Sequence, residues 1–190
     1  MNEQTVTSGP PTNETAQESG DNTRARKQPA LSLRFLSHGT LECKNIDRTR
    51  QFYEEFFGFE VVQPSKISLW IRLGGQHIYV VVQSNNPGEL GMGFLNHNGI
   101  DVSTEEEVDQ AYRVACEQAQ TWGLHKISKP TVQHGTYSFY FWDMDENCWE
   151  ILSNPEGGYT WMFERGDQEG MGHLKKSFAR PDSTLRKKTP

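Results

Sequence analysis

Cysteine is scarce in this 190-residue chain, which has three cysteines at widely separated positions, Cys43, Cys116 and Cys148. An odd number without paired spacing excludes a zinc finger and a disulfide framework. No apolar run approaches the length of a membrane span, and the N-terminus lacks the apolar core of a signal peptide. We therefore expect a protein of the reducing cytoplasm that has no membrane partner.

The chain also has no surplus of positive charge, because 25 acidic residues outnumber 19 lysines and arginines to give a net charge of −6. Nothing in the sequence resembles a basic face for nucleic acid, so we expect no nucleic-acid partner. The short basic clusters at residues 24–27 and 186–188 fall in the terminal segments, where charge favours solubility.

Large apolar residues are almost missing from residues 1–30, which are rich in Asn, Thr, Gln, Glu, Ser, Gly and Pro. Such a segment cannot offset the entropy of ordering it, so we predict a disordered N-terminal tail. The remaining chain is long enough for one domain with a sizeable core. We place this domain at residues 31–155 and a C-terminal extension at residues 156–190.

The order of predicted elements repeats within this domain. Residues 33–43 read as a strand, Asn45 or Asp47 caps a helix that Gly58 ends, and strands follow at 59–63, 67–73 and 77–83. In the second copy, a strand at 94–102 leads to a helix opened by a Ser103–Glu106 capping box and ended by Gly123. Its further strands are expected at residues 125–128, 136–142 and 148–152.

This order predicts an α+β fold of two paired βαβββ units, at about residues 33–83 and 94–153. Two such units can form a half-open curved sheet whose inner face holds a ligand. Strand alternation then decides which side chains point inward.

Three residues at related places in the two units could hold a divalent metal. His38 and His97 each lie on the predicted first strand of a unit, and Glu150 lies between Trp149 and Ile151 on the last strand. A lone strand histidine is more often a packed or hydrogen-bonded residue. Two at matching positions favour a metal site, as does an acidic residue in an apolar strand. Two imidazoles and one carboxylate suit Fe(II), Mn(II) or Zn(II) and leave positions open for substrate.

The segments at residues 36–41 and 45–62 resemble the vicinal oxygen chelate superfamily, the glyoxalase, bleomycin-resistance and dioxygenase group. The resemblance covers about residues 34–153. It implies that His38, His97 and Glu150 are the metal ligands.

A second resemblance concerns residues 132–150, which look like the signature of the type I extradiol ring-cleaving dioxygenases. It implies Fe(II), a catechol-like substrate and O₂, with Tyr140 bonded to a metal-bound substrate oxygen. It also implies that His134 holds a substrate hydroxyl or a product carbonyl. Residues 75–80 resemble the strand that carries the family's active-site histidine, which implies His77 as acid and base. The turn at residues 143–146 departs from the family pattern because it contains neither proline nor glycine.

Other functions remain open from the sequence. The same ligands occur in metal-dependent lyases, transferases and epimerases of the superfamily, often with Mn(II) or another divalent metal. A metal-free small-molecule-binding or resistance protein is a third alternative. We also expect a homo-oligomer. The aromatic segment 157–163 would either close over the mouth of the site or pack against a neighbouring subunit.

Overall fold

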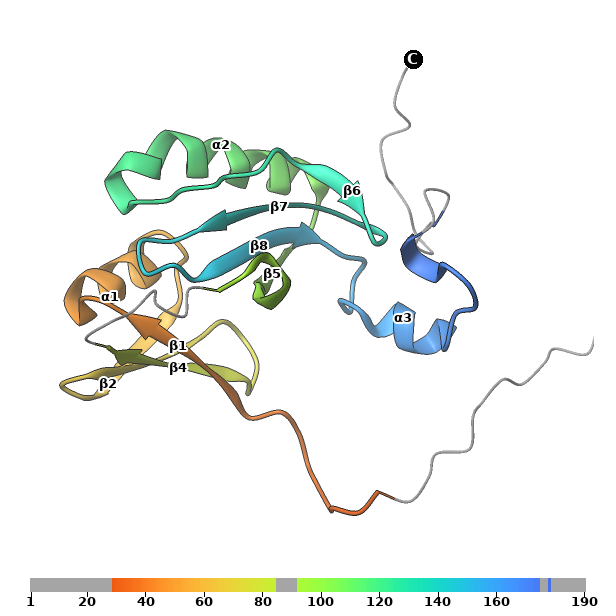
Figure 1. Ribbon diagram of the computed structural model, residues 1–190, viewed down its shortest axis with the longest axis horizontal. Coiled ribbons are helices and arrows are strands. Elements are labelled where there is room, and N and C mark those ends of the chain that lie inside the picture. The colour runs from red at the N-terminus through yellow and green to blue at the C-terminus, as the bar shows by residue number, and fades with distance from the viewer. Residues whose placement is uncertain (1–28, 85–91, 175–177, 179–190) are drawn as a thin grey trace, which may run out of the picture. The chain divides into compact units, whose positions relative to one another are not determined.

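The computed structural model describes residues 29–84, 92–174 and 178 (Figure 1). The chain divides into two units, residues 1–30 and 31–190, and the following account concerns the second. The tail predicted at residues 1–30 lies outside the described residues, apart from its last two. In the described residues, no helix has the length and apolar character that crossing a membrane requires.

The first half of this unit has the predicted βαβββ order. Its elements are β1 (His38–Cys43), α1 (Ile46–Glu55), β2 (Glu60–Ser65), β3 (Ser68–Arg72) and β4 (Ile78–Gln83). The strands form one sheet in the order β1-β4-β3-β2, in which β1 runs parallel to β4. As predicted, Asn45 caps α1, because its side chain accepts a hydrogen bond from the backbone N–H of Arg48. The first strand is shorter than expected and begins at His38 rather than at residue 33.

The second half repeats this order. Its elements are β5 (Asn98–Val102), α2 (Glu105–Trp122), β6 (Thr131–Gln133), β7 (Thr136–Trp142) and β8 (Cys148–Ser153). Its sheet has the order β5-β8-β7-β6, with α2 along one face (Figure 1). The predicted α+β class with two βαβββ units is thus confirmed. The described residues form two separate four-stranded sheets, which do not close on each other.

Three local predictions in the second half were wrong. The capping box uses Thr104 and Glu107 rather than Ser103 and Glu106, one residue later in the same acidic segment. Residues 94–96 form a short 3-10 helix, η1 (Phe94–Asn96), so the strand expected from residue 94 begins at Asn98. The strand expected at 125–128 is reduced to a single bridge between His125 and Trp142, and β6 forms three residues further on.

Aromatic packing joins the two halves. The ring of Phe52 on α1 lies 5.7 Å from that of Trp122 on α2. Tyr53 lies 6.0 Å from Trp149 on β8. All four side chains are buried. A core shared in this way holds the halves as one hydrophobic unit.

A buried polar contact reinforces this packing at the β7–β8 turn. The carboxylate of Asp145 accepts a hydrogen bond from the backbone N–H of Lys44 at 2.8 Å and from the hydroxyl of Thr49 at 2.6 Å. Next to it, Asp143 accepts the indole N–H of Trp149 at 2.9 Å. Each of these carboxylates therefore has partners for its buried oxygens, as burial of a charge requires.

After β8 the chain forms two further helical turns, α3 (Thr160–Arg165) and η2 (Gly172–Leu174). Trp161 on α3 is buried, and it approaches Gly135 in the β6–β7 turn so closely that an added Cβ there would lie 3.1 Å from the indole. This segment therefore packs on the end of the second sheet. The alternative of packing against a neighbouring subunit is not needed to bury Trp161.

Candidate metal centre

Two of the predicted ligands meet at the second sheet. His97 follows η1 and leads into β5, while Glu150 lies in the middle of β8. The Nδ1 atom of His97 is 2.6 Å from the carbonyl oxygen of Phe94, which can only accept, so Nδ1 is the donor. A neutral His97 therefore carries its lone pair on Nε2. That atom lies 3.3 Å from the Oε2 atom of Glu150.

This arrangement suits a cation. A lone pair facing a carboxylate oxygen places two acceptors next to each other, and either a proton on the imidazole or a positive ion offsets their repulsion. A hydrogen bond from the second ring nitrogen to a backbone carbonyl is also the usual way in which a ligating histidine is oriented. His97 and Glu150 therefore fit the donor set expected for a divalent metal.

A tyrosine and a glutamine hold the carboxylate in place. The hydroxyl of Tyr140 on β7 donates to the Oε1 atom of Glu150 at 2.6 Å. The side-chain amide of Gln133 on β6 donates to that same hydroxyl at 2.5 Å. Burial raises the pKa of Tyr140 well above its ordinary value, and its hydrogen bond to Glu150 raises it further. The phenol therefore remains a donor over the physiological pH range.

The register of the sheet explains why these residues share one face. Tyr140 is opposite Glu150 across the β7–β8 pair, and Gly99 is opposite Glu150 across the β5–β8 pair. Side chains directly opposite each other point to the same side of a sheet. At Gly99, an added Cβ would lie in ordinary contact with Oε2, at 3.9 Å, but would press on the side chain of Leu152 at 3.2 Å. The other face of the sheet, which carries Phe139 and Ile151, is covered by α2.

Phe94 completes the surroundings of the centre. Its ring lies 4.6 Å from that of Tyr140 and 5.8 Å from that of His97. The sequence did not single out Phe94 or Gln133. Because side chains alternate between the two faces of a strand, the β6–β7 hairpin could have placed Gln133 on the same face as Tyr140. No sequence pattern could show that η1 places Phe94 against that face.

His38 does not join this centre within the chain. It lies at the start of β1 in the first sheet, where it is exposed and its Nδ1 atom is 2.8 Å from the hydroxyl oxygen of Ser37. Among the described residues, no three His, Cys, Asp or Glu side chains come together as a metal site. A single copy thus brings together two of the three ligands, and the role of His38 stays a prediction.

The two other predicted histidines have different neighbours. His77 donates from Nδ1 to the carbonyl of Leu36 at 3.2 Å, and its ring packs edge-on against Tyr79 at 5.3 Å. His134 adopts a positive φ of 53° in the β6–β7 turn, and its ring lies 5.0 Å from that of His173. Neither forms a three-residue metal group with His97 and Glu150 in the part of the chain described here.

Solved structures provide the comparison with known proteins. The fosfomycin resistance protein FosX from Listeria monocytogenes, complexed with Mn(II) and sulfate, is 22% identical with a TM-score of 0.53 over 70% of this chain and 99% of that chain. A possible glyoxalase from Bacillus cereus is 20% identical with a TM-score of 0.51 over 62% of this chain and 97% of that one.

The chain has the vicinal oxygen chelate fold. No family model matches the sequence, and no curated protein matches it significantly. At these identities the likeness concerns the arrangement of the two βαβββ units, and it leaves the chemistry to be argued from the site itself. In the vicinal oxygen chelate fold of this chain, that site is the face of the second sheet that carries Glu150.

Proposed function

We propose that this protein is a divalent-metal-dependent enzyme whose substrate binds the metal through two neighbouring oxygen atoms. One observation carries the proposal: the Nε2 atom of His97 lies 3.3 Å from the buried carboxylate of Glu150, where a cation can bind both. Tyr140 holds the other carboxylate oxygen, Oε1, which leaves Oε2 beside Nε2 of His97.

The donor set of one or two imidazoles and one carboxylate suits Mn(II), Fe(II) or Zn(II). When bound, such a metal polarises a substrate oxygen as a Lewis acid. The FosX structure with Mn(II) supports a divalent metal on this fold.

We assign the third ligand to His38 of a second copy of the chain, which makes the protein a homo-oligomer. His38 pairs in register with Ile78, and the same face of the first sheet carries Trp70 and Val62, which are 47% and 58% exposed. An uncovered apolar sheet face that also presents a histidine fits the Glu150 face of a second copy, which needs one more ligand. Pairing would bury the exposed apolar area and complete the site together.

The remaining residues of the centre position and shield it. Tyr140 fixes the carboxylate of Glu150 through one oxygen and leaves the other for the metal, while Gln133 fixes the hydroxyl of Tyr140. Phe94 packs on Tyr140 and reduces the access of water on that side. Exclusion of water strengthens every electrostatic interaction with a bound substrate.

Among reaction types, the geometry favours Lewis-acid chemistry of the lyase, transferase or epimerase class. The groups held at the centre by short contacts are hydrogen-bond donors, Tyr140 and Gln133, and in the described residues no further imidazole completes a cluster there. An Fe(II) extradiol dioxygenase acting on a catechol-like compound with O₂ is the second candidate. Tyr140 lies at the same centre, although its hydroxyl donates to Glu150, whereas the dioxygenase resemblance assigns it to a substrate oxygen.

Metal analysis tests the proposal. Protein purified without oxygen and loaded with Mn(II), Fe(II) or Zn(II) should hold about one metal ion per chain after desalting. His97→Ala should lose the metal, whereas His134→Ala, a histidine in the β6–β7 turn, should retain it. Equal metal content in wild type and His97→Ala would refute the centre. Oxygen consumption with a panel of catechols then separates the two reaction types.

A further inference from the structure

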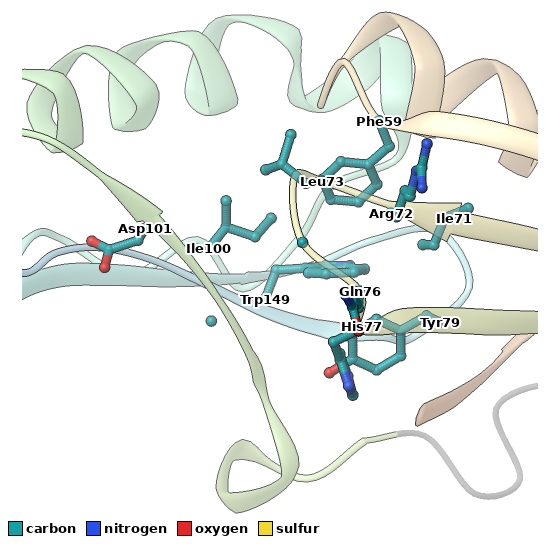
Figure 2. Close-up of a pocket in the computed structure, with 12 residues that line it drawn as sticks. Phe59, Ile71, Arg72, Leu73, Gln76, His77, Tyr79, Ile100, Asp101 and Trp149 are labelled. Atoms are coloured by element: carbon teal, nitrogen blue, oxygen red, sulfur yellow. The ribbon is translucent and has the colours of Figure 1, made fainter. Parts of the chain in front are cut away.

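A second cavity lies away from the metal centre. It has a volume of about 510 Å³ and opens between the β3–β4 hairpin and the β5 strand (Figure 2). Pockets that bind small molecules usually measure about 300–1,000 Å³. The cavity is therefore large enough for an organic ligand of one or two rings.

Rigid aromatic side chains form the inner surface of this cavity. The indole of Trp149 is 1% exposed and lies 6.0 Å from Phe59 and 6.5 Å from Tyr79, measured between ring centres. Figure 2 shows these rings together, with Leu73 and Ile100 beside them. Flat, immobile rings of this kind favour a planar apolar ligand, because stacking costs them little conformational entropy.

The cavity and the metal centre lie on opposite faces of β8. Trp149 lines the cavity and Glu150 belongs to the metal centre, and successive strand residues point to opposite sides of a sheet. A ligand in the cavity thus has the thickness of the sheet between itself and the metal ligands. This separation makes the cavity a site of its own.

Polar groups at the rim limit the charge of a ligand. Arg72 lines the cavity, but its guanidinium donates twice to Glu60, at 3.0 and 2.8 Å, so its charge is already paired. Asp101 also lines the cavity, but its carboxylate points away from the aromatic rings (Figure 2) and accepts the backbone N–H of Asn154 at 2.9 Å. No unpaired cation is thus offered to an anionic ligand by the charged residues that line the cavity. His77 uses Nδ1 as donor to Leu36, so the Nε2 atom of the neutral ring can accept a hydrogen bond.

We propose that this cavity is a second small-molecule site, which takes a neutral, planar, largely apolar ring compound with one hydroxyl group. The rings lie against Tyr79, Leu73 and Ile100, with the buried indole of Trp149 behind them, and the hydroxyl donates to His77. This role differs from the acid and base function that the sequence predicts for His77. The site does not depend on the metal, so its existence and the proposed function can fail separately.

Binding of 2-naphthol, naphthalene and naphthalene-2-carboxylate by the full chain tests the proposal, with calorimetry and ligand-observed NMR as readouts. We expect one 2-naphthol per chain, with binding unchanged after EDTA treatment, and clearly weaker binding of the carboxylate. Contacts from the ligand to the Trp149 indole should appear in the NMR spectra. His77→Ala should weaken 2-naphthol by roughly threefold to tenfold, the effect of one hydrogen bond, and leave naphthalene unaffected.

Two tryptophan variants localise the binding. Leu73 lines the cavity and is 57% exposed, so a larger side chain can be placed there without disturbing the core. Leu73→Trp should therefore fill the cavity and prevent binding of 2-naphthol. Val132 on β6 is 50% exposed and is not part of the cavity, so Val132→Trp should bind 2-naphthol like the wild type. Absence of saturable binding to the wild type, loss of binding with EDTA, or ligand contacts away from Trp149 would each overturn the proposal.

Discussion

The hydrogen bond from Tyr140 to Glu150 provides a sharp test of how the metal centre is organised. In Tyr140→Phe, the carboxylate loses a 2.6 Å donor while the aromatic packing against Phe94 stays in place. A hydrogen bond to a charged group contributes about 1.5–3 kcal/mol. Loss of a group that orients a metal ligand typically weakens metal binding about 10- to 100-fold. The two ranges agree, since about 1.4 kcal/mol corresponds to tenfold in affinity.

Titration calorimetry with Mn(II) or Zn(II) measures this loss directly. The matched control is Tyr137→Phe on the same strand, because the hydroxyl of Tyr137 donates to Asp109 at 2.8 Å on the opposite face. The control should bind metal within about twofold of the wild type. An unchanged affinity in Tyr140→Phe, or an equal loss in both variants, would show that Tyr140 does not orient the ligand.

The remaining predictions concern stability and reactivity. Asp145→Ala leaves the backbone N–H of Lys44 and the hydroxyl of Thr49 without an acceptor. The free energy of unfolding measured in urea should therefore fall by about 2–5 kcal/mol. A fall of less than about 1 kcal/mol would contradict the role of this contact. Burial raises the pKa of Asp143 from its ordinary 3.8 to about 6, so the folded state binds this proton more tightly than the unfolded state. Its contribution to stability should therefore increase as pH falls from about 6 to 4, and NMR titration of its carboxyl carbon should show a midpoint near 6 rather than near 4. Cys116 is exposed while Cys43 is buried with a pKa raised to about 11, mainly by burial, so one thiol of three should react rapidly with an aromatic disulfide reagent in the native protein. Cys116→Ser should abolish that rapid phase, and a rapid phase that persists would place the reactive thiol elsewhere.

The element order could be predicted from the sequence because its signals are local. Asn45 caps α1, Gly123 ends α2 in the left-handed conformation, and β7 and β8 are short, largely buried runs rich in aromatic and aliphatic residues. The predicted boundaries of helices and strands were wrong where neighbouring residues carry the same capping or strand signal. Thr104 and Glu107 form the capping box that Ser103 and Glu106 could also have formed.

The candidate site could be predicted only in part, because its assembly depends on contacts between distant segments. Tyr140 and Glu150 come together because the β7–β8 hairpin sets their register. Their separation of ten residues could not show this, because a turn lies between them. The contacts of His77 with Tyr79 and Leu36 arise from the pairing of β1 with β4 within the first half. The place of His77 relative to β8 depends instead on how the two halves pack. No local pattern tells on which side of β8 a histidine from the other half will lie. In our proposal, His38 reaches the centre from a second copy of the chain, which no pattern within one sequence can show.

Mixing two inactive variants tests the central claim, that His38 of one copy completes the metal centre formed by His97 and Glu150 of another. His38→Ala and Glu150→Ala should each lose the bound metal as purified homo-oligomers. When the two are unfolded, mixed in equal amounts and refolded, one copy supplies His97 and Glu150 and the other supplies His38, so one complete site forms in each mixed pair. Metal analysis of the isolated mixed species should then give one ion per pair. Mixed pairs without metal, or a His38→Ala protein that binds metal like the wild type, would contradict the account.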